Sequence, residues 1–138
     1  MERFYLGVDW ADQFHQIWVS DFEGKKVIEK TVVESVEGLA EFGRWLDESR
    51  AKGMEHWAAI EKPHGRIVDF LLDHGVEVYP VNPKALDRVR DRFRMSQSKS
   101  DGFDAYVLAE FVRTDHGHLR ALRPNSNEAQ ELKLFTRD

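Results

Sequence analysis

The sequence predicts an α/β domain in which helices pack on a mixed β-sheet. Three segments rich in β-forming residues follow one another with no helical pattern between them, which is typical of an antiparallel meander. Helical and strand patterns then alternate, and a strand–helix–strand unit prefers a parallel, right-handed crossover. At 138 residues, of which 41% are hydrophobic and 33% charged, the chain suits one domain with its own core.

The three strands of the predicted meander differ in pattern. Residues 3–11 (RFYLGVDWA) are a mostly apolar run, as expected for a central strand, whereas residues 14–21 (FHQIWVSD) alternate between two faces. The segment FEGK at 22–25 supplies a turn, and residues 26–35 (KVIEKTVVES) return as the third strand.

The second part of the chain alternates between helices and strands. Ser35 is suited to cap the first helix and Gly53 to end it. The basic segment 84–94 follows the last strand and shows a helical spacing of charges. The other predicted segments are a helix over 36–52, a strand over 54–63, a helix over 65–75, a strand over 76–83 and a helix over 101–114.

Composition excludes several classes of site. There is no cysteine, so a disulfide framework, a thiolate zinc site and a cysteine nucleophile are impossible. The histidines lack the spacing of a zinc site. No apolar run approaches the roughly 20 residues that cross a bilayer, and the N-terminus lacks a signal-peptide pattern. We therefore expect a soluble intracellular protein without a membrane partner.

Charge is unevenly distributed along the chain. The net charge of −5 argues against a general nucleic-acid binder, yet segment 84–94 holds five basic residues against two acidic ones. This segment is either an ordinary solvated helix face or a surface that contacts phosphates, and we favour phosphate contacts. The candidate nucleic-acid-binding residues are Lys84, Arg88, Arg90, Arg92, Arg94 and Lys99.

Four acidic residues are the candidate catalytic and metal-binding groups. Asp9 and Glu61 lie at the ends of two predicted strands. An ionised carboxylate is unfavourable when buried there, and ligands of α/β proteins bind at the carboxyl ends of the strands. Asp101 and Asp104 lie three apart at a predicted helix start and share one face. Each acid alone also fits a turn cap, an ion pair or a helix-dipole partner. Asp12 is a fifth candidate, which we expect not to contact the metal directly.

The combination of acids favours a divalent cation. Four carboxylates from three segments repel one another unless a cation lies between them, and Mg²⁺ or Mn²⁺ prefers carboxylate oxygens, water and substrate phosphate. Two such ions roughly 3.5–4 Å apart can activate an attacking oxygen and stabilise a leaving one. The pattern therefore predicts a magnesium or manganese site for phosphodiester chemistry.

Three motifs resemble one protein family. They are GVDWA with Asp9, AIEKPHG with Glu61, and VNPKALDRVRDRFRMSQSKSDGFDAYVLAEFVRTD with Asp101 and Asp104. Together they resemble the N-terminal catalytic domain of the insertion-sequence 110 family, which are DEDD transposases related to the Piv invertases. The resemblance covers nearly all of residues 3–115, and the third motif is the most specific.

The resemblance implies an RNase H-like (RuvC-like) fold, in which these four acids are catalytic and bind magnesium. It implies DNA strand cleavage and exchange in transposition, with a structured non-coding RNA that bridges donor and target DNA. Residues 1–120 would be the catalytic domain, and 121–138 the start of a helical segment leading to a C-terminal domain that supplies a serine nucleophile. We expect the full-length protein to be a homo-oligomer of the prokaryotic cytosol, and this fragment to be inactive alone.

Two other functions are weighed against this one. The chain could be a module that holds the bridging RNA without cutting anything. It could also be a sugar-kinase-like ATPase domain, because the GVD motif occurs there too. That function ranks last, since the sequence shows no second glycine-rich phosphate-binding loop after a strand.

Overall fold

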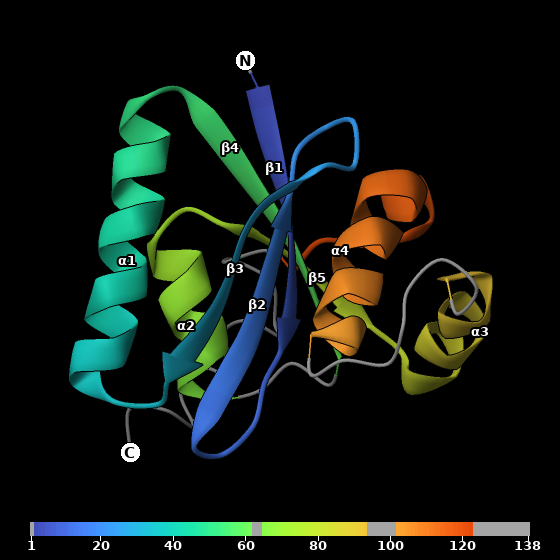
Figure 1. Ribbon diagram of the computed structural model, residues 1–138, viewed down its shortest axis with the longest axis horizontal. Coiled ribbons are helices and arrows are strands. Elements are labelled where there is room, and N and C mark those ends of the chain that lie inside the picture. Colours follow the sequence, from blue (N-terminus) through green and yellow to red (C-terminus); the bar gives the residue numbers. More distant parts are fainter. Residues whose placement is uncertain (1, 62–64, 94–101, 123–138) are drawn as a thin grey trace.

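The computed structural model describes residues 2–61, 65–93 and 102–122, and its centre is a five-stranded mixed sheet (Figure 1). The strands lie in the order β3-β2-β1-β4-β5. Strand β1 pairs antiparallel with β2, and β2 with β3, whereas β1, β4 and β5 run parallel. The strands are β1 (Glu2–Asp9), β2 (Phe14–Ser20), β3 (Lys26–Val33), β4 (Met54–Glu61) and β5 (Glu77–Val81). The predicted meander and parallel crossovers are thus confirmed.

Helices cover both faces of this sheet. Helices α1 and α2 lie on one face, where α1 contacts β3 and β4 and α2 contacts β5 (Figure 1). Helix α4 lies across β1 and β2 on the other face, and α3 packs against α4. The helices are α1 (Val36–Ala51), α2 (Arg66–Asp73), α3 (Pro83–Phe93) and α4 (Phe103–Asp115), followed by the short 3-10 helix η1 (His116–His118). None of the helices within residues 2–61, 65–93 and 102–122 is long and apolar enough to cross a membrane.

The helix ends follow local chemistry. The Gly38 N–H donates a 2.9 Å hydrogen bond to Ser35 Oγ, which confirms the predicted cap of α1. Gly53, the predicted stop of this helix, has φ +95 and lies just before β4. Asn82 caps α3 by accepting a 2.8 Å hydrogen bond from the Lys84 N–H. Helix α4 begins at Phe103, two residues later than predicted, and the predicted helical segment over 121–138 lies outside the described residues from position 123 onward.

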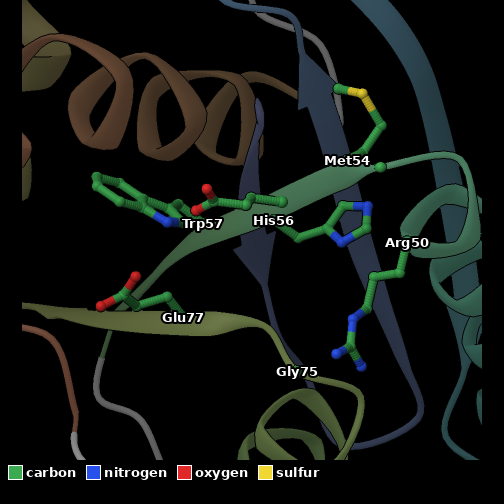
Figure 2. A pocket seen from close by; sticks show the side chains of 8 residues that line it. Arg50, Met54, His56, Trp57, Gly75 and Glu77 are labelled. Atoms are coloured by element: carbon green, nitrogen blue, oxygen red, sulfur yellow. The ribbon is translucent and has the colours of Figure 1, made fainter. Parts of the chain in front are cut away.

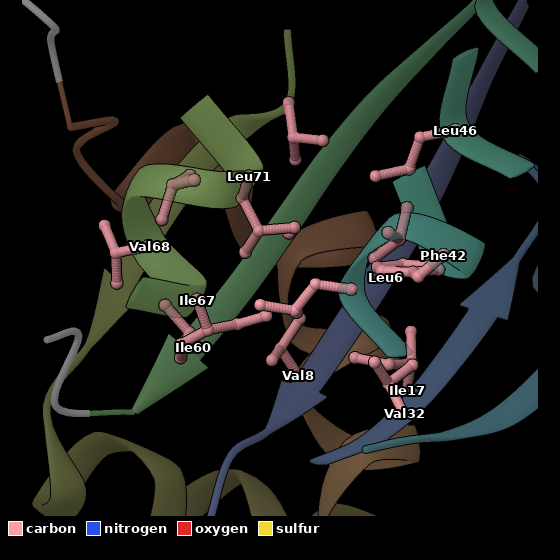
Figure 3. Close-up of a cluster of buried hydrophobic side chains, with 14 of the residues drawn as sticks. Leu6, Val8, Ile17, Val32, Phe42, Leu46, Ile60, Ile67, Val68 and Leu71 are labelled. Carbon is pink, nitrogen blue, oxygen red and sulfur yellow. The ribbon is translucent and has the colours of Figure 1, made fainter. Parts of the chain in front are cut away.

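Alternation along the strands divides the core into two clusters. Leu6 and Val8 of β1 point toward α1 and α2, where they pack with Ile60, Phe42 and other apolar side chains (Figure 3). The odd-numbered residues of β1 point toward α4 instead, and Tyr5 belongs to the second cluster. Burial of each large apolar side chain contributes about 1.5–3 kcal/mol. The second cluster also contains Ala59, Tyr79, Val81, Leu86, Val89, Val107, Leu108, Phe111 and Val112.

Candidate active site

Asp9 and Glu61 lie next to each other at the carboxyl edge of the parallel strands. The β1–β4 register pairs Gly7 with Ala59 and Val8 with Ile60, and the two acids follow as the last residues of their strands. The parity of both strands directs them toward α4. The Trp10 indole N–H donates a 2.6 Å hydrogen bond to the Glu61 carbonyl oxygen, which ties the two strand ends together. The predicted juxtaposition of these two acids is therefore present.

Asp104 reaches the same place because α4 approaches β1 unusually closely. A Cβ atom at Gly7 would lie 1.7 Å from the Ala105 carbonyl oxygen and 2.6 Å from the Ala109 nitrogen. Any side chain at Gly7 would therefore collide with the backbone of α4. This glycine, two residues before Asp9, lets the first turn of α4 carry Asp104 to the strand ends.

Arg90 from α3 binds this group of acids. Its Nε and Nη2 donate hydrogen bonds of 3.0 and 3.2 Å to the two carboxylate oxygens of Asp104. Nη2 also lies 3.9 Å from Glu61 Oε2, and Nη1 pairs with Asp87 on the same helix. The Arg90 side chain is only 23% exposed. One guanidinium is thus shared among carboxylates from three elements.

Electrostatics show that the acids are crowded. Burial raises the pKa of Asp9 above its usual value of 3.8, and the charges of Asp104 and Glu61 raise it further, while Arg90 acts in the opposite direction. The hydrogen bond to Asp104 is the main cause that raises the pKa of Arg90. A cation is therefore favoured among these oxygens, and in this structure the Arg90 guanidinium supplies that charge.

The donor set suits a hard divalent cation, because Asp9, Glu61 and Asp104 offer only carboxylate oxygens. Among the described residues, however, no group of three or more Asp, Glu or His side chains has the geometry to hold a metal ion. Arg90 contacts Asp104 and Glu61 instead. Asp101, the fourth predicted ligand, lies outside the described residues.

The other predicted site residues lie around this cluster or outside it. Lys84, Arg88 and Arg92 are exposed on α3, which is the helix that the basic segment forms. Arg92 pairs with Asp115 at 3.1 Å. Asp12 is exposed in the segment between β1 and β2. The predicted nucleic-acid-binding residues Arg94 and Lys99 lie outside the described residues.

The sequence interpretation missed the contact between Arg90 and the acids. It grouped Arg90 with the phosphate-binding residues of the basic segment. A signal was nevertheless present, because Arg90 follows the buried Leu86 by four residues and adjoins the buried Val89, so it shares the inner side of α3.

A pocket at the opposite edge of the sheet is lined by a buried histidine, His56 (Figure 2). It is lined by residues at the start of β4 and β5, including His56, and by Arg50 from the end of α1. His56 is buried, and its Nε2 shares a 2.8 Å hydrogen bond with the Ser49 hydroxyl. Burial, assisted by the charge of Arg50, lowers the pKa of His56 to about 4. The acids that line this pocket are two, Glu55 and Glu77, whereas the carboxyl edge brings together Asp9, Glu61 and Asp104, so the carboxyl edge is the candidate active site.

Comparison with known proteins identifies the family. The model of the insertion-sequence 110 DEDD family, described as Transposase, matches residues 6–138. The chain belongs to this transposase family. The resemblance inferred from the three motifs is therefore confirmed.

Two curated relatives support the assignment. The Sinorhizobium fredii protein named "Putative transposase y4uE" is 40% identical over 135 residues, which cover 96% of this chain and 38% of that protein. The Streptomyces coelicolor protein named "Mini-circle putative transposase for IS117" is 36% identical over 141 residues, which cover 96% of this chain and 32% of that protein. The chain thus spans about a third of the length of these relatives.

A solved structure supports the fold. The structure titled "T. thermophilus RuvC in complex with Holliday junction substrate" matches with a TM-score of 0.55 at 13% sequence identity, over 88% of this chain and 99% of that one. The predicted RuvC-like, RNase H-like fold is therefore confirmed, and at this identity the likeness concerns the fold alone.

Proposed function

We propose that this chain is the metal-dependent catalytic domain with which a transposase cleaves and exchanges DNA strands. The observation that carries the proposal is the convergence of Asp9, Glu61 and Asp104, from β1, β4 and α4, at one edge of the sheet. Family membership supports it, because the same three motifs that define the resemblance bring these acids together.

The proposed ligands of Mg²⁺ or Mn²⁺ are these three acids together with Asp101. A bound divalent ion would supply Lewis-acid stabilisation of charge on the scissile phosphate and its attacking oxygen. Asp9 and Glu61 are fixed by the sheet, and the Trp10 hydrogen bond holds the strand ends in place. Asp104 is carried by α4, so the position of that helix against Gly7 sets the spacing of the acids.

The proposed macromolecular partners are DNA and a structured non-coding RNA. Lys84, Arg88 and Arg92 are exposed on α3, the helix that carries Arg90 into the acid cluster, and are suited to phosphate contacts. Arg94 and Lys99 are proposed to extend this surface. The RuvC neighbour is titled as a complex with a Holliday junction, which supports a DNA partner for a chain of the same fold.

Strand exchange is proposed for the longer protein rather than for these 138 residues alone. The curated relatives are about three times longer than the segment that this chain matches. We propose that residues 1–120 are the catalytic domain, that residues 121–138 begin a helical segment, and that the whole protein works as a homo-oligomer. The 138 residues should bind the metal without completing strand exchange.

The decisive experiment compares Asp104→Asn with Asp12→Asn in the full-length protein. Asp104→Asn should reduce Mg²⁺-dependent strand cleavage by at least about 100-fold while leaving nucleic-acid binding intact, because it removes a metal ligand but no basic contact. Asp12→Asn changes an exposed acid outside the cluster and should cleave normally. Full cleavage by Asp104→Asn would refute the proposed site and favour a module that holds RNA without catalysis.

A further inference from the structure

Arg90 contacts two of the proposed metal ligands, Asp104 and Glu61. Both carboxylate oxygens of Asp104 accept a hydrogen bond from the Arg90 guanidinium, and Glu61 Oε2 lies 3.9 Å from its Nη2. A cation bound by Asp104 and Glu61 would meet the positive guanidinium at the same oxygens. Because the two are alike in charge and compete for the same carboxylates, the guanidinium in this position weakens the binding of a cation.

We propose that Arg90 is a built-in competitor of the divalent cation. Its guanidinium neutralises Asp104 and Glu61 while the metal is absent, and it leaves them when the metal binds. This inference rests on the proposed function, since it assumes that the acids are metal ligands. It assigns Arg90 as a positioning residue that sets when the site can be loaded.

The surroundings of Arg90 provide a place for the displaced guanidinium. Asp87, one helical turn earlier on α3, already contacts Nη1, and its side chain is 70% exposed. The guanidinium therefore keeps an acceptor on the solvent side when it leaves Asp104. Phosphate is a second acceptor, because arginine binds phosphate oxygens in a two-point arrangement. A nucleic-acid phosphate entering the site would thus draw Arg90 away and make metal binding easier.

A purely structural role for Arg90 predicts a different result. As a brace, its bonds would hold α3 against α4 and keep Asp104 in position. Removal of the side chain would then loosen Asp104 and leave metal binding weaker or unchanged. Competition predicts tighter binding, so the sign of the change distinguishes the two roles.

The test is titration of the 138-residue chain with Mn²⁺ after removal of metal by EDTA, with free Mn²⁺ followed by electron paramagnetic resonance. Arg90→Gln should bind Mn²⁺ about tenfold more tightly than the unchanged chain, because two charge-assisted hydrogen bonds no longer have to be broken. Arg90→Lys keeps the charge but loses the paired geometry and should lie between them. Arg44→Gln is the control, since Arg44 is exposed on α1, on the other side of the sheet from the acids, and the Mn²⁺ affinity of this variant should not change.

Two further measurements decide the remaining outcomes. A short phosphorylated oligonucleotide should raise the Mn²⁺ affinity of the unchanged chain more than that of Arg90→Gln. If Arg90→Gln does not fold, Arg90→Lys alone decides, and affinity equal to or weaker than that of the unchanged chain refutes the competition. Asp104→Asn separates the two proposals: if it loses Mn²⁺ binding while Arg90→Gln gains none, only the competition fails. If Asp104→Asn still binds Mn²⁺ normally, the proposed metal site fails.

Discussion

The two faces of the sheet are formed by the same strands but carry different side chains at the strand ends. The face under α1 and α2 is filled with apolar side chains such as Val8, Ile60 and Phe42 (Figure 3). The face under α4 has its own apolar cluster, but at the strand ends Asp9 and Glu61 follow in the same alternation. A shift of one residue along either strand would exchange a core residue for a carboxylate. Position in the strand therefore decides whether a residue supports the fold or the site.

Polar groups on the two faces show the same contrast. His56, on the face that α1 covers, is accommodated as a neutral ring with Ser49 as its partner. Asp9, on the α4 face, stays close to other carboxylates and depends on Arg90 for compensation. A buried histidine is accommodated in its neutral form, whereas a cluster of acids is retained where a cation can bind. The following substitutions test this contrast.

The largest effect on stability is expected from Phe42→Ala. Phe42 is 1% exposed and stacks on Trp45 and Phe70, so truncation leaves a cavity and should lower the free energy of unfolding by about 4 kcal/mol. Mn²⁺ affinity of the folded fraction should be unchanged, because α1 does not contribute to the acids. Chemical denaturation measures the loss. Phe22→Ala, at a side chain 72% exposed, is the control and should change stability by less than about 0.5 kcal/mol.

Gly7→Ala changes the face of the sheet that α4 covers and should lower the free energy of unfolding by about 3 kcal/mol. The added Cβ would collide with the Ala105 carbonyl oxygen, so α4 would have to move. Unlike Phe42→Ala, this change should also weaken Mn²⁺ binding, since Asp104 moves with the helix. Gly117→Ala is the matched control, because a Cβ added there would meet no atom of the described residues within 4 Å. Normal metal affinity in a folded Gly7→Ala chain would show that the approach of α4 does not set the site.

His56→Gln should remove an acid-dependent loss of stability of about 2 kcal/mol. The folded-state pKa of His56, about 4, lies below its ordinary value of 6.5, so its stabilising contribution is complete above pH 6.5 and is lost as the pH falls toward 4. Glutamine cannot be protonated there and keeps a polar group near Ser49. The free energies of unfolding measured at pH 7 and at pH 4.5 should therefore differ less in this variant than in the unchanged chain.

The fold was predictable because periodicity reports burial directly. The alternation in residues 14–21 and the apolar run in 3–11 predicted β2 and β1, and local capping by Ser35 marked the start of α1. Asp9 and Glu61 were predictable for a related reason: parallel strands end at one edge. These features depend on residues close together in the sequence or on the general geometry of sheets.

The details of the site depend on contacts between distant segments. A side chain at Gly7 would collide with the backbone of Ala105, which is distant in the sequence, and no local pattern shows how closely a helix approaches a strand. The pairing of Arg90 with Asp104 depends likewise on how α3 packs against α4. Charge patterning placed Arg90 among phosphate-binding residues, whereas its spacing from Leu86 indicated the inner side of the helix. Periodicity was the better guide, because it reports which side of α3 is buried.

The smallest effect, and the sharpest test of the charged face, is expected from Asp9→Asn. The folded-state pKa of Asp9 lies above its ordinary value of 3.8, so its ionised form destabilises the fold at neutral pH, and this penalty is relieved as the pH falls through the folded-state pKa. In EDTA at pH 7, Asp9→Asn should therefore be more stable than the unchanged chain, by less than about 1 kcal/mol because the carboxylate is partly solvated. The gain should disappear below pH 3.8, where both side chains are neutral. With Mn²⁺ present the order should reverse, because only the unchanged chain is stabilised by metal binding. A loss of stability in EDTA would instead mean that the attraction of Arg90 outweighs the repulsion from Asp104 and Glu61.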